Sequence, residues 1–344
     1  MLTFYNEHHG QHRGRRECHR GDMVPCREKP ERIDLVLGEL QRRGLGEIVT
    51  PHRVPLVSLE RIHSPRYLHF LRSAWSEWLA LDAANADKDA LPSSWAIRGM
   101  RHDIEPDSFA GRLGLYSMDS GTPLTSGTWN AAKTGADCAI NAAHALRLGE
   151  RGSFALTRPP GHHAGFDFFG GYCFLNNAAL AAQHLLDDGL KRVAILDIDY
   201  HHGNGTQSIF YGRSDVLFVS VHADPRTDYP FYLGHADETG SGEGLGYNMN
   251  LPLPRAASAQ QWMAALETAC IKLGMFAPEA LVVSLGVDTA ASEGGFGLQG
   301  ADFLRVGERI AWLGLPTAFV FEGGLGPDIG INTVNVLEGF ETAA

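Results

Sequence analysis

Five continuous apolar segments alternate with helical patterns in the second half of the chain, and this alternation restricts the possible fold more than any other feature. The apolar segments are GSFALTRPP (152–160), KRVAILDID (191–199), DVLFVSVHAD (215–224), EALVVSLGVD (279–288) and TAFVFEGG (317–324). Helical patterns follow at 174–189, 257–276 and 300–314. Strands that are apolar at every position are typical of a parallel sheet covered on both faces. We therefore predict a doubly wound or related α/β domain.

The first 130 residues are less regular. One helical pattern covers 30–44, and the segment from about 80 to 127 has no clear periodicity. We interpret that segment as long loops at the rim of the domain or as a subunit contact. Because no Pro/Ser-rich linker or charge block divides the chain, we predict one domain over residues 1–344.

The amino-acid composition limits which binding partners and which cellular compartment we expect for this protein. With 29 Lys and Arg against 40 Asp and Glu, the net charge of −11 has the wrong sign for binding nucleic acid and mildly favours a cationic ligand. No apolar run approaches the roughly 18 residues of a membrane span, and the N-terminus lacks the apolar core of a signal peptide. The five cysteines form no C-x-x-C pair. We expect a cytoplasmic protein with reduced thiols and no membrane partner.

Each predicted strand ends in polar or glycine-rich sequence. These ends read RPPGHHAG, DIDYHHGNG, SVHADP, SLGVD and EGGLG. In open parallel sheets, ligands bind outside the carboxyl ends of the strands. Five such ends at one edge of the sheet therefore predict a functional site there.

A set of carboxylates and one imidazole at these ends has the composition of a metal site. Asp199 and His201 alternate with Asp197 in LDIDYHH, and Asp288 follows another strand. Asp199, His201 and Asp288 would give three ligands with open positions, as in catalytic zinc sites. A single Asp at a strand end more often caps a turn, but the combination of residues favours metal binding over that interpretation.

The tandem His162 and His163 lie in a loop bounded by Pro and Gly between a strand and a helix. Buried beside a metal, the pair could serve as general base and electrostatic catalyst. Asp197 and Asn204 are candidates to orient the two rings. The alternative is a His-His dipeptide exposed in a loop.

Tyr172 and Tyr229 lie in neighbouring loops and could form the walls of a narrow slot, although isolated aromatic residues are more often packing residues. We assign Gly171 and Gly323 to substrate binding as well. The segment 240–248 is interpreted as a turn, since its Gly-x-Gly neither follows a strand nor precedes a helix.

Taken together, the motifs RPPGHHAG, GYCFLNNAA, DIDYHHGNGTQ, SVHADP, SLGVDT and FEGG resemble the arginase/deacetylase superfamily. Within it, the chain is similar to the bacterial class II histone-deacetylase-like and acetylpolyamine amidohydrolase group, over about residues 20 to 340. The resemblance implies a three-layer α/β/α arginase-like fold with a central, mostly parallel sheet. It also implies hydrolysis of an amide.

The resemblance assigns roles to the motif residues. Asp199, His201 and Asp288 would bind Zn²⁺, with Fe²⁺ as a possible alternative, and His162 and His163 would form the general base and acid pair. Asp197 would support His162, Asn204 would stand near His163, and Tyr172 and Tyr229 match the aromatic walls of an acyl-lysine channel. A structural K⁺ is expected near Asp197, Asp199, His201, Ser220 and Val221, and a second monovalent ion near the backbone of Phe210, Arg213 and Val216.

Two features depart from the family pattern. The loop carboxylates that meet the cationic chain of acetylpolyamines fall on small residues, Ala110 and Gly121, with Glu105, Asp107 and Asp119 nearby. The long loop still implies the homodimer of that group. At the position of the tyrosine that stabilises the oxyanion, this chain has Leu325.

A leucine side chain cannot donate a hydrogen bond, and loss of one oxyanion donor typically costs about 10²- to 10³-fold in rate. A different acyl group, a replacement donor, binding without efficient turnover or an introduced substitution would each account for Leu325. The leading hypothesis is a zinc-dependent amidohydrolase acting on an acylated amine such as acyl-lysine or acylpolyamine. The alternatives are an acyl-amine binding or sensing protein with weak catalysis, and hydrolysis of an unrelated small-molecule amide.

Overall fold

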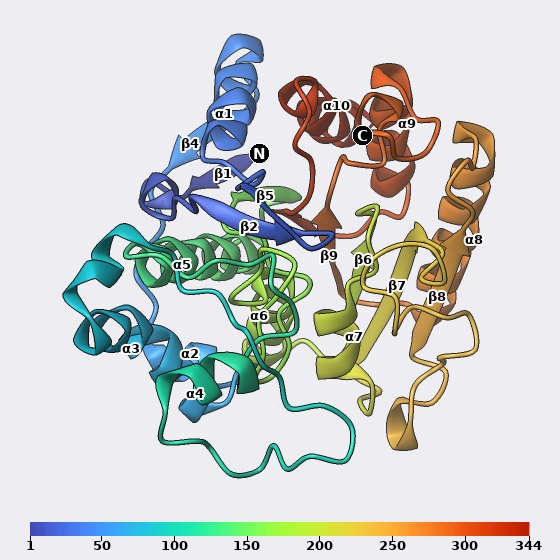
Figure 1. The fold of residues 1–344 in the computed structure, drawn as a ribbon. Coiled ribbons are helices and arrows are strands. Elements are labelled where there is room, and N and C mark those ends of the chain that lie inside the picture. The colour runs from blue at the N-terminus through green and yellow to red at the C-terminus, as the bar shows by residue number, and fades with distance from the viewer. Residues whose placement is uncertain (344) are drawn as a thin grey trace.

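Eight strands form one parallel sheet at the centre of the computed structural model, which describes residues 1–343 (Figure 1). The strand order is β4-β1-β5-β10-β9-β6-β7-β8. The strands are β1 (Leu2–Tyr5), β4 (Glu47–Val49), β5 (Gly152–Leu156), β6 (Val193–Asp197), β7 (Val216–Ala223), β8 (Asn248–Leu253), β9 (Ala280–Leu285) and β10 (Thr317–Phe321). An antiparallel hairpin of β2 (Arg16–His19) and β3 (Asp22–Pro25) lies apart from this sheet.

Ten α-helices are described in residues 1–343. They are α1 (Glu31–Arg43), α2 (Leu56–Leu59), α3 (Pro65–Leu81), α4 (Phe109–Leu115), α5 (Thr128–Arg147), α6 (Asn177–Asp187), α7 (Asn204–Phe210), α8 (Ala259–Phe276), α9 (Gly300–Ala311) and α10 (Ile329–Thr342). Over the same residues, no helix combines the length and apolar content needed to cross a bilayer.

The sheet is covered on both faces, and alternate residues of each central strand belong to different cores. In β6, Ile195 packs in the core formed with α3, α5 and α6, whereas Leu196 packs in the core formed with α1, α8, α9 and α10. In β10, Val320 belongs to the first of these cores and Phe319 to the second. The expected three-layer α/β/α architecture is therefore confirmed.

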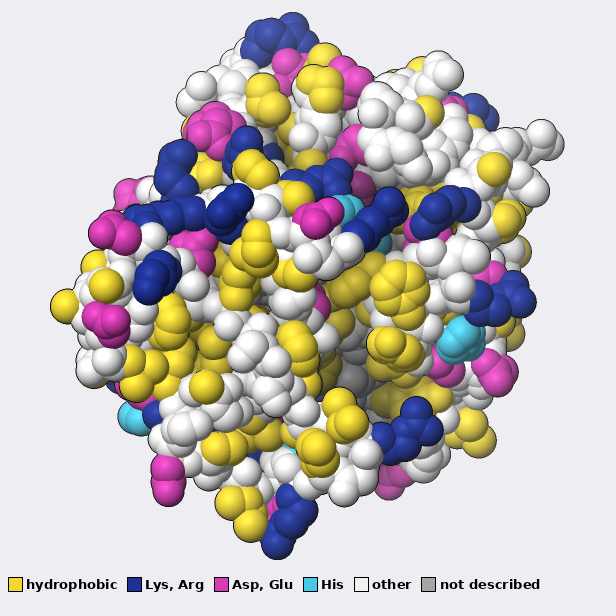
Figure 2. Space-filling model, viewed as in Figure 1, with side chains coloured by type: hydrophobic (Ala, Val, Ile, Leu, Met, Phe, Trp, Pro, Cys, Tyr) yellow, Lys and Arg dark blue, Asp and Glu magenta, His cyan; other side chains and the backbone are white. Residues whose placement is uncertain are grey.

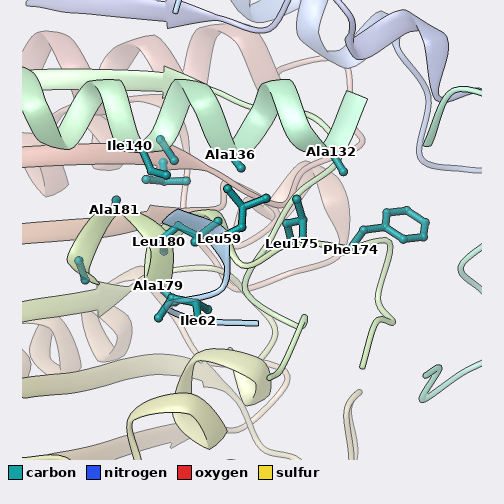
Figure 3. Packing of buried hydrophobic residues seen from close by; sticks show 14 of the residues in the cluster. Leu59, Ile62, Ala132, Ala136, Ile140, Phe174, Leu175, Ala179, Leu180 and Ala181 are labelled. Carbon is teal, nitrogen blue, oxygen red and sulfur yellow. The ribbon is translucent and has the colours of Figure 1, made fainter. Parts of the chain in front are cut away.

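Helices α5 and α6 pack closely against each other on one face of the sheet (Figure 3). Their contact is built from small and medium apolar side chains, including Ala132, Ala136 and Ile140 of α5 and Ala179 and Leu180 of α6, all of them buried. Alanine side chains allow two helices to approach closely, and a close-packed contact resists relative movement. This contact fixes the two helices relative to one another.

The five predicted strands and the four predicted helices are confirmed, with ends shifted by a few residues. The first 130 residues, expected to be less regular with one helix at 30–44, also contain β1, β4 and the 17-residue helix α3, which the sequence analysis did not identify. The interpretation of 240–248 as a turn did not foresee β8, which begins at Asn248. Strands β1 and β4 are only four and three residues long. Strand β8 lies at the edge of the sheet with partly exposed residues, so it lacks a continuous apolar run.

The segment from about 80 to 127 consists mainly of loops, as expected, but it also contains α4 and a short 3-10 helix, Ala83–Asp87. Its exposed large apolar side chains are those of Leu81, Ile97, Met100 and Ile104. Its role in a dimer contact stays a prediction.

A buried ionic network joins the N-terminal region to the loop after β10. The Arg158 side chain is fully buried; its Nε donates to Glu28 Oε1 over 2.7 Å, and its Nη1 donates to the carbonyl oxygen of His12 over 2.7 Å. Arg32 of α1 also donates to Glu28 Oε1 and extends to the carbonyl oxygens of Gly324, at 2.9 Å, and Glu322. One carboxylate therefore balances two buried guanidinium groups.

We expect Glu28→Ala to lower the free energy of unfolding by about 3–5 kcal/mol, because it leaves buried cations without a counter-charge. Glu31→Ala is a matched control, since Glu31 pairs with Arg13 on the exposed surface and its loss should cost about 1 kcal/mol or less. Urea unfolding followed by tryptophan fluorescence measures both values. Equal, small effects of the two substitutions would contradict the role given to this network.

Candidate active site at the carboxyl ends of the strands

Asp199, His201 and Asp288 converge at the carboxyl ends of β6 and β9. His201 Nδ1 lies 3.3 Å from Asp199 Oδ1 and 3.1 Å from Asp288 Oδ2. Strand β6 ends at Asp197, so Asp199 and His201 lie in the turn after it and not on extended strand as the alternation suggested. The turn brings the side chains of Asp199 and His201 together, whereas a straight strand would keep them apart.

The surroundings of these three side chains fit a divalent cation. Asp199 Oδ2 accepts from Gly323 N over 2.7 Å, and Asp288 Oδ1 accepts from Tyr200 N over 2.9 Å. The remaining oxygens, Asp199 Oδ1 and Asp288 Oδ2, both face the single His201 Nδ1. Burial alone would lower the pKa of His201, but its hydrogen bonds to the two carboxylates raise that pKa to about 10. One ring nitrogen facing one buried and one partly buried carboxylate is the donor set of a three-ligand metal site.

Gly323 carries the loop after β10 across the two carboxylates. A Cβ at this position would lie 2.3 Å from Asp199 Oδ2 and 2.7 Å from Asp288 Oδ2. Any larger residue would displace these ligands, so the close approach requires glycine.

His162 is buried and paired with a carboxylate that is itself buried. Its Nδ1 donates to Asp197 Oδ2 over 3.0 Å, and its Nε2 lies 3.8 Å from Asp199 Oδ1. Burial opposes the charged form, but the charges of Asp197 and Asp199 and the hydrogen bond from His162 to Asp197 raise the pKa of His162 to about 10. The two carboxylates therefore favour the protonated state of the His162 ring.

His163 has the opposite electrostatic environment, although the ring centroids of the two histidines are only 4.1 Å apart. Burial and the nearby charges of His162 and His201 hold the pKa of His163 well below its usual range. Its Nδ1 donates to Asn204 Oδ1 over 2.6 Å. The lone pair is consequently on Nε2, and the surroundings of the two rings push their pKa values in opposite directions.

Tyr229 and Gly171 form a wall beside His163. The Tyr229 ring stands perpendicular to the His163 ring, with 5.0 Å between centroids. A Cβ on Gly171, whose φ is +54°, would lie 2.2 Å from His163 Cδ2. Asp119 Oδ2 links the two residues of this wall, because it accepts hydrogen bonds from Gly171 N over 2.6 Å and from Tyr229 Oη over 2.8 Å.

Tyr172 is held by a different carboxylate. Its hydroxyl donates to Glu17 Oε1 over 3.0 Å, and Glu17 is buried. The surface of the protein is hollowed near the middle of the face seen in Figure 2, and hydrophobic side chains border this hollow.

Leu325 lies two residues beyond Gly323 with 41% of its surface exposed. Its backbone N donates to Glu293 Oε2 over 2.6 Å, so the loop is attached through the main chain. The side chain offers no hydrogen-bond donor.

Sequence reasoning did not identify Glu17, Glu293 or Glu322. Glu322 Oε2 accepts from Gly161 N over 2.6 Å and from His162 N over 3.2 Å, which supports the histidine loop. Burial raises the pKa of Glu322 to about 7. Its place directly after an apolar strand was a usable signal, whereas nothing in the sequence connects Glu17 or Glu293 to the site.

The model of the histone deacetylase domain matches residues 26–335 of the chain. The chain belongs to the histone deacetylase family. The match confirms the resemblance drawn from the motifs. Acetylpolyamine amidohydrolase 2 of Pseudomonas aeruginosa is 51% identical over 99% of both chains, and the acetylpolyamine amidohydrolase of Mycoplana ramosa is 42% identical over 98% of this chain and 99% of its own.

Solved structures agree with this assignment. The crystal structure of acetylpolyamine aminohydrolase from Burkholderia pseudomallei has a TM-score of 0.94 and 37% identity, covering 100% of this deacetylase-family chain and 99% of its own. The HDA15 HD domain has a TM-score of 0.78 at 25% identity and covers 100% of this chain and 90% of its own. By class, the protein is a hydrolase acting on amide bonds.

We expect Gly323→Ala to slow amide hydrolysis by about 10²-fold, because the added methyl group must displace the carboxylates of Asp199 and Asp288 by about 1 Å. Gly274→Ala is the control, since a Cβ there meets no atom within 4 Å. Steady-state hydrolysis of a fluorogenic acyl-lysine amide measures both variants. A normal rate for Gly323→Ala would show that the loop tolerates a side chain at this position.

Proposed function

We propose that this protein is a zinc-dependent amidohydrolase that removes an acyl group from a small acylated amine. The observation that carries the proposal is the convergence of Asp199, His201 and Asp288 beside a buried histidine pair whose Nδ1 atoms bond to Asp197 and Asn204. Held by these three side chains, Zn²⁺ (or Fe²⁺) would supply Lewis-acid chemistry for acyl hydrolysis.

The two histidines divide the proton transfers between them. His163 accepts the proton of the attacking water at Nε2, because its Nδ1 carries a proton that is donated to Asn204 Oδ1. His162 keeps its positive charge through Asp197 and stabilises the negative charge that develops on the acyl oxygen. His163 then returns a proton to the leaving amine.

The wall of the site favours an amine substrate that carries positive charge. Asp119 and Glu17 hold Gly171 and Tyr172, respectively, and neither carboxylate forms a salt bridge within residues 1–343. Relatives over the full length are named acetylpolyamine amidohydrolases. Although Ala110 and Gly121 lack the loop carboxylates of that group, Asp119 supplies a negative charge beside the histidine pair. Acylpolyamine and acyl-lysine are both consistent with this chemistry.

Leu325 favours a second candidate function, an acyl-amine binding or sensing protein with weak catalysis. All groups that would hold a metal and move protons are present, but the side chain at 325 gives no donor to the oxyanion. A slow enzyme would still bind its ligand, and an acyl group with a more electrophilic carbonyl needs the donor less.

We also infer the monovalent ions and the homodimer from the family. Asp197 is fully buried and aligned with Ser220 of β7, which is the environment expected of the structural K⁺ site. Arg213 N donates to Phe210 O over 2.9 Å in the turn before β7, where the second ion is expected.

Leu325→Tyr should raise the kcat for acetyl-lysine and acetylpolyamine substrates by about 10²- to 10³-fold, because it adds a donor for the oxyanion. Leu325→Phe is the matched control, since it adds the ring without the hydroxyl. Trifluoroacetyl-lysine should be cleaved briskly by the unmodified protein. If metal-loaded protein cleaves no amide of this panel but binds one of them in calorimetry, the binding function replaces the enzymatic one.

Removal of divalent metal by a chelator should abolish hydrolysis, and added Zn²⁺ should restore it. Asp199→Ala protein should stay inactive after the same addition, because it lacks one of the three ligands. Hydrolysis rates are compared with metal content measured by mass spectrometry. A full rate in protein shown to be metal-free would contradict the metal-dependent mechanism.

A further inference from the structure

A second group of potential metal ligands lies at the ends of α5 and α6, outside the candidate active site. It consists of His144 in the last turn of α5, His184 in the last turn of α6, and Asp188 just after α6. Helix α6 begins next to the histidine loop, where Asn177 Nδ2 donates to the carbonyl oxygen of Pro159. Its 11 residues place the second group about 16 Å from that end.

The three donor atoms form an almost equilateral triangle. His144 Nδ1, His184 Nε2 and Asp188 Oδ2 are separated by 3.4 Å along each of the three sides. In a tetrahedral site with zinc–ligand bonds of about 2.0–2.2 Å, ligand atoms lie about 3.4 Å from one another. The spacing therefore matches three corners of a metal tetrahedron.

Hydrogen bonding alone does not account for this arrangement. Each imidazole nitrogen has either one proton or one lone pair, so neither can serve two partners well, and 3.4 Å is long for such a bond. A cation at the centre of the triangle uses all three atoms at once.

The neighbouring charges leave the Asp188 carboxylate available. Arg147 donates to the backbone carbonyl oxygen of Asp188 and not to its side chain. The adjacent Asp187 is already bound by Arg61 and Gln183. The carboxyl ends of both helices also favour a cation electrostatically.

The packing described between α5 and α6 fixes the helix turns that carry the two histidines, whose side chains are partly exposed. His144 and His184 are 40 residues apart in sequence, yet their rings are brought together by two helices whose alanine-rich contact is buried (Figure 3). A preorganised set of donors loses little conformational freedom on binding.

We propose that His144, His184 and Asp188 bind a divalent transition metal such as Zn²⁺ or Ni²⁺, with water completing its coordination. Two imidazoles and one carboxylate suit these ions better than Mg²⁺ or Ca²⁺, which prefer oxygen ligands. Binding links the ends of α5 and α6 and stabilises the folded protein.

The test uses tag-free protein and Ni²⁺ as the probe, with bound metal counted by equilibrium dialysis and mass spectrometry. His184→Ala should bind one Ni²⁺ fewer per chain than the unmodified protein, and it should lose the rise in Tm that Ni²⁺ produces. His69→Ala, which removes an exposed histidine of α3, should change neither value.

Asp288→Ala separates this site from the candidate active site, because it should retain the Ni²⁺ that His184→Ala loses. The difference of one equivalent is expected whether or not the active site binds Ni²⁺. Equal Ni²⁺ binding by the unmodified protein and His184→Ala would overturn the proposal, as would an equal loss in His69→Ala.

Discussion

Negative charge buried at one edge of the sheet is the constraint on which the rest of the site depends. Asp197 and Asp199 are buried at the end of β6, and the partly buried Asp288 lies a few residues beyond the end of β9. Isolated carboxylates there would be strongly disfavoured. The imidazole of His162, in its protonated form, and the proposed cation would each offset part of that charge. Glycine at 323 brings a backbone N–H close enough to contribute.

This charge balance gives two adjacent histidines opposite roles. His162 faces carboxylates, whereas His163 faces a neutral amide and the positive charge of its neighbour. In the proposed mechanism the same residue type therefore serves as a fixed cation and as a proton acceptor within one dipeptide. The difference comes from the elements opposite each ring and not from the dipeptide itself.

Sequence reasoning found the parts of the molecule whose chemistry is local. Continuous apolar strands and the polar residues after them are visible in the sequence, and ligands bind at such strand ends in parallel sheets. Short or partly exposed strands such as β1 and β8 lack that pattern. Glu17 lies on the β2–β3 hairpin and Asp119 in a long loop, and tertiary packing decides where both lie, so no spacing rule relates them to Tyr172 or Tyr229.

The position of β10 has a consequence for how the protein is made. This strand joins β4-β1-β5 on one side to β9-β6-β7-β8 on the other, yet it is the last strand to leave the ribosome. The histidine loop follows β5, and Asp199 and Asp288 follow strands of the other half. Until residues 317–321 emerge and pair on both sides, no strand-to-strand hydrogen bonds can join the two parts of the sheet. Alignment of the histidine loop with Asp199 and Asp288 through the sheet therefore waits for one of the last segments to be synthesised, although α6 also packs against β6 and β9.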